Sequence, residues 1–476
     1  MNADRNITIR NQLASGPRSV QQIVEFTGIS QPTVSRTIKA LGQEIVRFGP
    51  YQSIQYALRR PLLATPDIPI YRVTPEGQLE TLGTLSPVHP AGYVMTPSAG
   101  RATLSEGFPW WLDDMRPQGF LGRAFVAALA APLDLPSRLG DWQEEHVLRA
   151  LISQFGYDAV GNLVLGERGR EHFLLRQEPL PLTASLLHDS YALLAQQALS
   201  GETPASSAGG EQPKFTAYVE TASGQSHVLV KFTLPDAEIQ ANPVARRWRD
   251  LLLAEHHALS LLRENGVSSV STRIIDHGQQ RFLEVERFDR IGPHGRRGLI
   301  SLSAMDAEFV GLGQGGWPGI TARLAAERHI SRQAHETTCL LHAFGTLIGN
   351  TDMHPGNLSF VTDGDQPYEL APAYDMLPMA FAPRASGELP NSLPAPLLDS
   401  QVATAHWQAA LVLGRAYLER LREDTDSAKY LRAASRRLKR IWQPGKCGLG
   451  GWGDLQGLLR STAKQLNILK PHLPYY

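Results

Sequence analysis

The 476-residue chain contains only two cysteines, Cys339 and Cys447, which stand in unrelated contexts without metal-ligand spacing. This scarcity excludes a disulfide framework and a cysteine-based zinc site, and it is typical of the reducing cytoplasm. No run approaches the roughly 18 uninterrupted apolar residues of a membrane span, and the first residues, MNADRNITIRNQ, lack an apolar signal-peptide core. We therefore expect a soluble, cytoplasmic protein with no membrane partner.

The chain also lacks net charge, because 46 basic residues balance 46 acidic ones. Its first 60 residues depart from this average, since eight lysines and arginines face three acidic residues there, a local charge of +5. No low-complexity tract occurs, and 42% of the residues are hydrophobic, as in globular proteins. A basic module inside a neutral globular protein favours nucleic-acid binding by that module.

Residues 1–62 are predicted to form a winged helix-turn-helix domain that binds double-stranded DNA. Three helical segments, ITIRNQLASG, SVQQIVEFTG and QPTVSRTIKALGQ, precede a predicted hairpin, IVRFGPYQSIQYALRR. Ser19 and Ser30 stand at expected N-caps, and Gly28 is expected to make the turn. The side chains expected to contact DNA lie on the third helix: Gln31, Thr33, Ser35, Arg36 and Lys39. A small helical docking domain is the alternative, which the local charge disfavours.

A change of composition at 61–69 marks the end of this domain. Residues 65–200 are predicted to form a second domain. It begins with a β-hairpin, IYRVTPEGQLETLG, whose turn falls at 75–77, and it continues mostly as helix.

The remainder is predicted to form two lobes. Residues 201–300 form a strand-rich lobe, in which a helix over 244–264 separates the strands FTAYVE and HVLVKF from FLEVERF. Residues 301–476 form a helical lobe, with helix over about 321–349 and further amphipathic helices in 403–470.

The segment GNTDMHPGNLSF is the most informative part of the chain. Asp352 precedes Asn357 by five residues, the spacing of a kinase catalytic loop, where the aspartate accepts the hydroxyl proton and the asparagine binds a metal ion. Asp375, eighteen residues after Asn357, stands among strand-like and turn-forming residues and suits a further Mg²⁺ ligand. An Asp, a His and an Asn around Pro-Gly are more than a turn requires, which indicates a catalytic loop.

Two upstream features occur in the order that kinases have. Lys231 closes the apolar strand HVLVKF, from which a lysine can reach the α- and β-phosphates of ATP, and Glu255 on the next helix can pair with it. Gly209 and Gly210, ahead of Lys214, allow backbone N–H groups to approach phosphate. Each feature alone also fits an ordinary strand or loop, and their common order indicates phosphotransfer.

These residues also carry a family resemblance. The motifs SAGGEQPK, VLVKF, VERFDR, NTDMHPGN and YDMLP, in this order, resemble the HipA family of serine/threonine kinases, toxins of bacterial toxin–antitoxin systems. The resemblance covers roughly 65–440. It implies an α+β, bilobal protein-kinase-like fold behind the winged helix-turn-helix domain, ATP and Mg²⁺ as cofactors, a protein substrate and growth inhibition. HipA proteins usually obtain DNA binding from a separate antitoxin, so the need for an antitoxin partner is open here.

The resemblance implies roles for individual residues. Asp352 is the expected proton acceptor, and Asn357 and Asp375 are the expected Mg²⁺ ligands. The residues expected around the nucleotide are Gly209, Gly210, Glu211, Gln212, Pro213, Lys214, Lys231, Glu286, Arg287, Phe288, His354, Pro355, Gly356, Asn357, Tyr374 and Asp375. Ser207 occupies the position that the family autophosphorylates, where a phosphate adds about two negative charges beside the nucleotide.

Two other functions fit parts of the sequence. A small-molecule phosphotransferase of the aminoglycoside or choline kinase type also contains Asp-x-His-x-x-Asn in its catalytic loop. A nucleotide-sensing transcription regulator would bind DNA through residues 1–60 and keep its activity without Asp352. Phosphorylation of Ser207 or of a serine peptide would distinguish a protein kinase from the first alternative.

Overall fold

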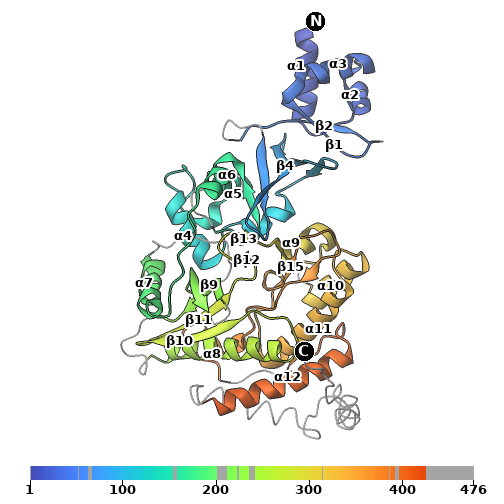
Figure 1. The fold of residues 1–476 in the computed structure, drawn as a ribbon. Coiled ribbons are helices and arrows are strands. Elements are labelled where there is room, and N and C mark those ends of the chain that lie inside the picture. Colours follow the sequence, from blue (N-terminus) through green and yellow to red (C-terminus); the bar gives the residue numbers. More distant parts are fainter. Residues whose placement is uncertain are drawn as a thin grey trace. The chain divides into compact units, whose positions relative to one another are not determined.

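The computed structural model describes residues 2–51, 53–62, 67–153, 158–200, 212–221, 224–234, 242–313, 315–384, 386–391 and 396–424. The chain divides into two compact units (Figure 1). The first unit contains residues 1–229 and 287–300, and the second contains residues 230–286 and 301–476.

The helix-turn-helix domain opens the first unit. It consists of α1 (Asn2–Ala14), α2 (Val20–Thr27), α3 (Gln31–Leu41) and the antiparallel strands β1 (Ile45–Phe48) and β2 (Gln55–Leu58). Ser19 Oγ accepts a hydrogen bond from Gln22 N, and the Gln22 side chain accepts one from Ser19 N, which forms a capping box. Gly28 ends α2 with a φ of 68°, a conformation that glycine adopts without strain. The predicted helices, the turn at Gly28 and the cap at Ser19 are confirmed, whereas Ser30 stands at the N-cap of α3 without a side-chain cap bond.

The β1–β2 hairpin lies between two apolar clusters. One cluster holds the three helices together and consists of Ile9, Leu13, Ile23, Val34, Ile38, Leu41, Ile45 and Leu58. The other joins Val46, Phe48 and Ala57 of the hairpin to Val88 and Val94 of the following sheet. Because side chains alternate along a strand, β1 contributes Ile45 to one cluster and Val46 and Phe48 to the other. The hairpin therefore connects the helix-turn-helix domain to the sheet.

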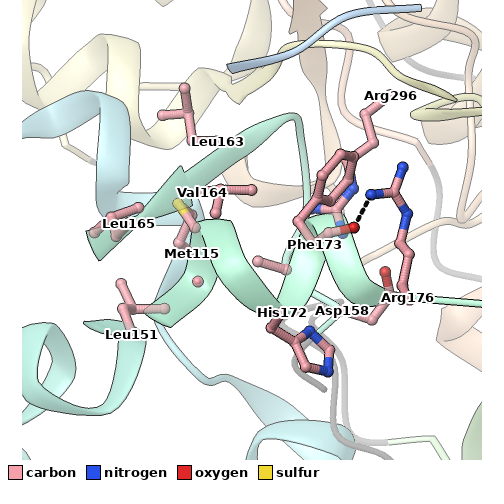
Figure 2. A pocket seen from close by; sticks show the side chains of 12 residues that line it. Met115, Leu151, Asp158, Leu163, Val164, Leu165, His172, Phe173, Arg176 and Arg296 are labelled. Atoms are coloured by element: carbon pink, nitrogen blue, oxygen red, sulfur yellow. Dashed lines mark hydrogen bonds between the residues drawn. The ribbon is translucent and has the colours of Figure 1, made fainter. Parts of the chain in front are cut away.

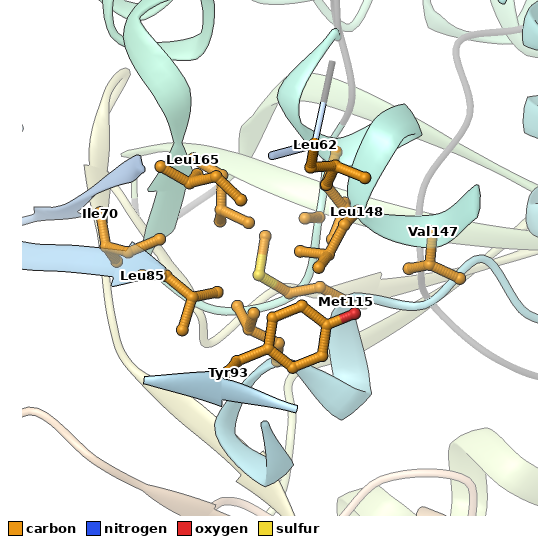
Figure 3. Packing of buried hydrophobic residues seen from close by; sticks show 12 residues of the cluster. Leu62, Ile70, Leu85, Tyr93, Met115, Val147, Leu148 and Leu165 are labelled. Atoms are coloured by element: carbon orange, nitrogen blue, oxygen red, sulfur yellow. The ribbon is translucent and has the colours of Figure 1, made fainter. Parts of the chain in front are cut away.

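That sheet has five strands in the order β6-β5-β4-β3-β7. Its strands are β3 (Ile68–Val73), β4 (Leu79–Pro87), β5 (Tyr93–Pro97), β6 (Thr103–Ser105) and β7 (Leu163–Leu165). The predicted turn at 75–77 joins β3 to β4. Figure 3 shows the core against the sheet, in which Ile70 and Leu85 pack with Leu148 from α5 (Glu144–Ile152).

The other helices of the first unit are α4 (Gly119–Leu129), α6 (Gly166–Leu175) and α7 (Leu187–Ser200). Tyr191 of α7 packs edge to face on Phe215, with ring centroids 5.2 Å apart. Phe215 belongs to β8 (Lys214–Thr221), which is followed by β9 (Gly224–Phe232). These two strands confirm the predicted FTAYVE and HVLVKF strands. The unit closes with the short hairpin of β12 (Arg290–Ile291) and β13 (Gly295–Arg296).

The second unit begins within β9 and continues into the predicted helix, α8 (Pro243–Glu264). Asn242 caps α8, since its Oδ1 accepts from the backbone N–H groups of Val244 and Ala245. The antiparallel pair β10 (Thr272–His277) and β11 (Gln280–Glu286) follows, and the sheet order is β10-β11-β9-β8. The remaining elements are β14 (Leu299–Ser301), α9 (Leu302–Met305), α10 (Trp317–Ala326), α11 (Arg332–Ile348), β15 (Ser359–Val361), β16 (Glu369–Leu370) and α12 (Thr404–Glu423).

The helical region predicted over about 321–349 consists of two helices, because α10 ends at Ala326 and α11 starts at Arg332. Arg328 adopts a φ of 64°, which breaks the helical path. Ser331 then caps α11 by accepting from Ala334 N at 3.0 Å.

In the described part of the chain, no helix is long and apolar enough to cross a membrane.

Candidate active site

Lys231 and Glu255 form the predicted ion pair inside the second unit. Lys231 Nζ donates to both carboxylate oxygens of Glu255, at 2.7 and 2.9 Å. Glu255 is fully buried, and Lys231 is 5% exposed between the buried Val230 and Phe232 of β9. Burying two charges costs about as much as their attraction returns, so such a pair adds little stability and indicates a functional site.

Asp375 completes a three-residue ion cluster. Its Oδ1 accepts a hydrogen bond from Lys231 Nζ at 2.6 Å. Burial by itself lowers the pKa of Lys231, but the negative charges of Asp375 and Glu255 outweigh burial and raise that pKa. Two carboxylates around one ammonium leave a net negative charge, which suits the approach of a divalent cation.

The backbone at Asp375 is strained. Its φ is 53°, a left-handed conformation that costs roughly 1–3 kcal/mol at a residue other than glycine. Strain of this kind persists where the surrounding structure imposes it, and it is frequent at functional sites.

The predicted catalytic loop follows α11, which ends at Gly349 with a φ of 84°. Asn357 Nδ2 donates to the backbone carbonyl of Asp352 at 2.9 Å. This bond directs the amide oxygen of Asn357 away from that carbonyl. In the described residues nothing donates a hydrogen bond to this amide oxygen, which leaves it available as a metal ligand. The structure thus brings the two ends of the Asp-x-x-x-x-Asn motif together.

Asn350 is a buried residue that the sequence analysis missed. Its Oδ1 accepts from Asp352 N at 3.0 Å, and its Nδ2 donates to the carbonyl of Asp375 at 3.4 Å. One side chain therefore links the proposed base to the proposed metal ligand. An Asn side chain often accepts a hydrogen bond from the backbone N–H two residues further on, and Asn350 offered this signal in the sequence.

Gly345 of α11 allows the catalytic loop to pack closely. A β-carbon at this position would overlap the sulfur of Met353 and lie 3.3 Å from the sulfur of Met376. Gly345 O also accepts from Asn350 N at 2.8 Å. A side chain at residue 345 would therefore require the Met353 and Met376 side chains to move.

Asp352 lies in this loop and its side chain is exposed. Partial burial of its carboxyl, and then the negative charge of Asp375, raise the pKa of Asp352 above its ordinary value, while His354 and Lys231 oppose the shift. A raised pKa makes a carboxylate a stronger proton acceptor, which fits the role expected for Asp352.

Aromatic side chains hold the rest of the loop. Tyr374 OH donates to Gly356 O at 3.0 Å and lies 2.8 Å from Ser359 Oγ. Trp317 Nε1 donates to the carbonyl of His354 at 2.9 Å. The resemblance places four of these residues beside the nucleotide. Tyr374 contacts the loop, and the other three, His354, Pro355 and Gly356, are part of it.

Other predicted nucleotide residues lie elsewhere or outside the described residues. Lys214 is buried at the start of β8 in the first unit, directly after Gln212 and Pro213. Glu286 ends β11 in the second unit, whereas Arg287 and Phe288 belong to the first unit. Ser207, Gly209, Gly210 and Glu211 lie outside the described residues. The structure therefore gathers only part of the predicted nucleotide set.

Among the described residues, no group of three or more His, Cys, Asp or Glu side chains is placed to hold a metal ion.

The predicted DNA-binding residues lie on one face of α3. Four of these side chains are exposed, those of Gln31, Ser35, Arg36 and Lys39. The fifth, Thr33, is half-buried. The opposite face contributes Val34, Ile38 and Leu41 to the core. Arg36 bonds only within its own helix, to Pro32 O at 3.3 Å and Thr33 Oγ1 at 3.5 Å, so its charge faces solvent.

Three family descriptions match successive parts of the chain. Residues 7–44 match the bacterial regulatory proteins of the arsR family, residues 64–174 match the middle domain of YjjJ-like toxins, and residues 206–442 match the HipA-like C-terminal domain. The chain is also 40% identical over 416 residues to toxin YjjJ of Escherichia coli strain K12, which covers 87% of this chain and 92% of that relative.

The chain belongs to the family of YjjJ-like, HipA-type toxins. The expected HipA resemblance, α+β fold class and amino-terminal helix-turn-helix are thereby confirmed. The match over 64–174 assigns the five-stranded sheet and its helices to the middle domain of these toxins.

Two solved structures are more distant matches. The HipA–HipB–operator DNA complex of Shewanella oneidensis is 16% identical, with a TM-score of 0.48, and the match covers 78% of this chain and 95% of that one. The proinflammatory kinase CtkA of Helicobacter pylori is 14% identical, with a TM-score of 0.34, and the match covers 48% of this chain and 88% of that one. The family assignment does not depend on either.

Proposed function

We propose that this YjjJ-like toxin is a cytoplasmic, ATP- and Mg²⁺-dependent serine/threonine protein kinase that phosphorylates itself on Ser207 and inhibits growth. The cluster of Lys231, Glu255 and Asp375 beside the Asp352 loop carries the proposal. This combination corresponds to the lysine–glutamate pair, metal aspartate and base of kinases.

Each described residue has a role that its surroundings support. ATP supplies the phosphoryl group, and Mg²⁺ would be held by Asp375 and the free amide oxygen of Asn357. Lys231, kept protonated by two carboxylates, would bind phosphate oxygens. Asp352, with its raised pKa, would accept the proton of the acceptor serine hydroxyl.

We further propose that α3 binds double-stranded DNA, with phosphate contacts from Arg36 and Lys39. The exposed polar face of the helix and the local charge of +5 support this role. The two proposed functions use different parts of the chain, because the DNA-binding residues lie in the first unit and the catalytic cluster lies in the second.

The test is the intact mass of the purified protein after incubation with Mg-ATP, followed by peptide mapping. We expect wild type to gain phosphate, an increase of about 80 Da per group, on Ser207. Asp352→Ala should gain none, and Asp365→Ala, which removes an exposed aspartate a few residues beyond the catalytic loop, should behave as wild type.

Other outcomes would reject parts of the proposal. Equal phosphorylation of Asp352→Ala would remove Asp352 from the catalytic role. ATP consumption with an aminoglycoside or choline acceptor, and no protein phosphorylation, would establish the small-molecule kinase. Absence of any phosphoryl transfer, with DNA binding intact, would favour the nucleotide-sensing regulator.

A further inference from the structure

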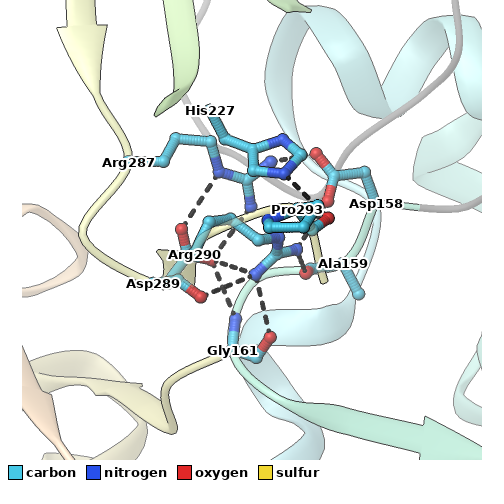
Figure 4. A network of polar contacts seen from close by, with 8 residues as sticks. All are labelled: Asp158, Ala159, Gly161, His227, Arg287, Asp289, Arg290 and Pro293. Atoms are coloured by element: carbon cyan, nitrogen blue, oxygen red, sulfur yellow. Dashed lines mark hydrogen bonds and ion pairs between the residues drawn. The ribbon is translucent and has the colours of Figure 1, made fainter. Parts of the chain in front are cut away.

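The middle of the first unit contains a charge-balanced ion network (Figure 4). Asp158 accepts hydrogen bonds from Arg287 and, at 2.5 Å, from Arg290. Asp289 accepts from the same two arginines, at 3.0 and 2.9 Å from Arg287 and at 2.7 Å from Arg290. Two guanidinium groups and two carboxylates neutralise one another, so this network alone needs no ligand.

Two further arginines beside the network, Arg176 and Arg296, form no ion pair with a carboxylate of the described residues. Arg176 donates to His294 Nδ1 at 2.8 Å and otherwise to backbone carbonyls. The guanidinium of Arg296 makes no hydrogen bond or ion pair with any described residue. Both groups approach the ring of Phe173, with guanidinium carbons 3.0 and 5.7 Å from its centroid (Figure 2). A ring face offers only weak compensation for two positive charges.

These two arginines line a pair of adjoining cavities of about 220 and about 210 Å³. Asp158, Phe173, Arg176 and Arg296 border both cavities, His172 borders the first and His294 the second. Asp158 is the one carboxylate among the lining residues, and its two oxygens already accept from Arg287 and Arg290. The cavity walls therefore carry uncompensated positive charge.

The β12–β13 hairpin fixes Arg296 at this wall. Gly295 packs against the backbone of Pro75, where any β-carbon would overlap the Pro75 carbonyl. Arg296 N donates to Thr74 O at 3.1 Å, which anchors the residue on the β3–β4 turn. The backbone of Arg296 is thus held beside the cavity before any ligand binds, which reduces the entropy lost on binding.

Burial disfavours the charged forms of Arg296 and Arg176 in the protein without a bound anion. Burial, and then the positive charges of Arg290 and Arg287, lower the pKa of Arg296 to about 9, although Asp158 and Asp289 oppose the shift. Burial also lowers the pKa of Arg176 to about 10. An anion between the two guanidinium groups would relieve this cost.

We propose that this pocket of the first unit binds a small phosphate-bearing anion between Arg176 and Arg296. Guanidinium groups donate paired N–H bonds that match phosphate oxygens, and a dianion balances the two unpaired positive charges. The cavities have room for inorganic phosphate or for a small phosphate monoester. All the residues that carry this inference lie in the first unit, so it does not depend on the proposed kinase activity.

The test is isothermal titration of the full chain with inorganic phosphate and, separately, with free O-phosphoserine at constant ionic strength. We expect saturable binding of at least one probe and a loss of affinity of tenfold or more in Arg296→Gln and in Arg176→Gln. Tighter binding of phosphoserine than of phosphate would identify a monoester ligand, and the reverse order would identify phosphate.

Two controls isolate the pocket. Arg168→Gln removes the same charge from an exposed position on α6 that does not line the cavities, and it should bind as wild type. Lys231→Met should also bind as wild type, which separates this pocket from the proposed nucleotide site. The proposal is overturned if wild type binds neither probe, or if both pocket variants fold and bind with wild-type affinity.

Discussion

Asp250 of α8 is buried in the second unit, at 4% exposure, and its Oδ2 has no hydrogen-bond partner among the described residues. Burial raises the pKa of Asp250 from 3.8 to about 7, although neighbouring arginines, first Arg281 and Arg247, lower it. Arg247 is occupied elsewhere, because it donates to Phe381 O at 2.7 Å and to Pro390 O at 2.6 Å. The carboxyl of Asp250 therefore holds its proton to a higher pH than an ordinary aspartate does.

The raised pKa of Asp250 predicts a pH-dependent stability. The folded protein holds this proton between the unfolded pKa of 3.8 and the folded pKa of about 7, whereas the unfolded chain releases it. The contribution of Asp250 to the free energy of unfolding is therefore complete below the lower value and is lost as pH rises through the upper one, at up to about 1.4 kcal/mol per pH unit.

We expect Asp250→Asn to remove this dependence and to be more stable than wild type at pH 8. Urea unfolding of both proteins between pH 5 and pH 8 measures the effect. Asp365→Asn, at an exposed aspartate, should keep the wild-type slope. Parallel slopes in wild type and Asp250→Asn would show that Asp250 titrates normally.

At the scale of one element, α3 separates its two faces cleanly. Val34 and Ile38 are buried in the core, while Ser35, Arg36 and Lys39 are exposed. This separation follows from the helical period of 3.6 residues, which explains why the sequence alone predicted the helix and its outer side chains.

We expect Arg36→Ala to weaken binding of the chain to double-stranded DNA and to reduce the salt dependence of that binding by about one counterion, if Arg36 contacts a phosphate. Gel-shift or anisotropy measurements at several salt concentrations give both quantities. Arg168→Ala is the matched control, since it removes an exposed arginine outside the helix-turn-helix domain. Equal losses in the two variants would assign the effect to overall charge and would exclude a specific contact.

At the scale of the molecule, the hairpin joins the helix-turn-helix domain to the middle domain. Phe48 is 7% exposed and packs with Val88 and Val94, and Gly49 N donates to Ala102 O at 3.1 Å. These contacts give the two domains a common core. The helix-turn-helix domain and the middle domain therefore belong to one compact unit.

We expect Phe48→Ala to lower the free energy of unfolding by roughly 3–5 kcal/mol, because it leaves a cavity between the hairpin and the sheet. Phe26→Ala is the control, since Phe26 is 63% exposed and its removal should cost well under 1 kcal/mol. Chemical denaturation followed by circular dichroism compares the two. Similar losses in both variants would mean that the Phe48 contacts do not bind the domains together.

The candidate site was predictable where its residues form a local pattern. The Asp352 and Asn357 spacing, the strand that ends near Lys231 and the helix that carries Glu255 are short-range features, and the structure contains all of them. The role of Asn350 was not predicted, because one of its two hydrogen bonds reaches Asp375, 25 positions further along the chain.

The sequence by itself determined the succession of elements, the helix-turn-helix domain and the resemblance to HipA, because periodicity, capping residues and motif order are local properties. Only the tertiary structure decided the contact of Lys231 with Asp375, the break at Arg328 and the pocket between Arg176 and Arg296. Arg296 follows Arg176 by 120 positions. Only the folded structure shows that neither arginine forms an ion pair with a carboxylate of the described residues. Charge compensation is a property of neighbours in space, and a linear pattern does not record it.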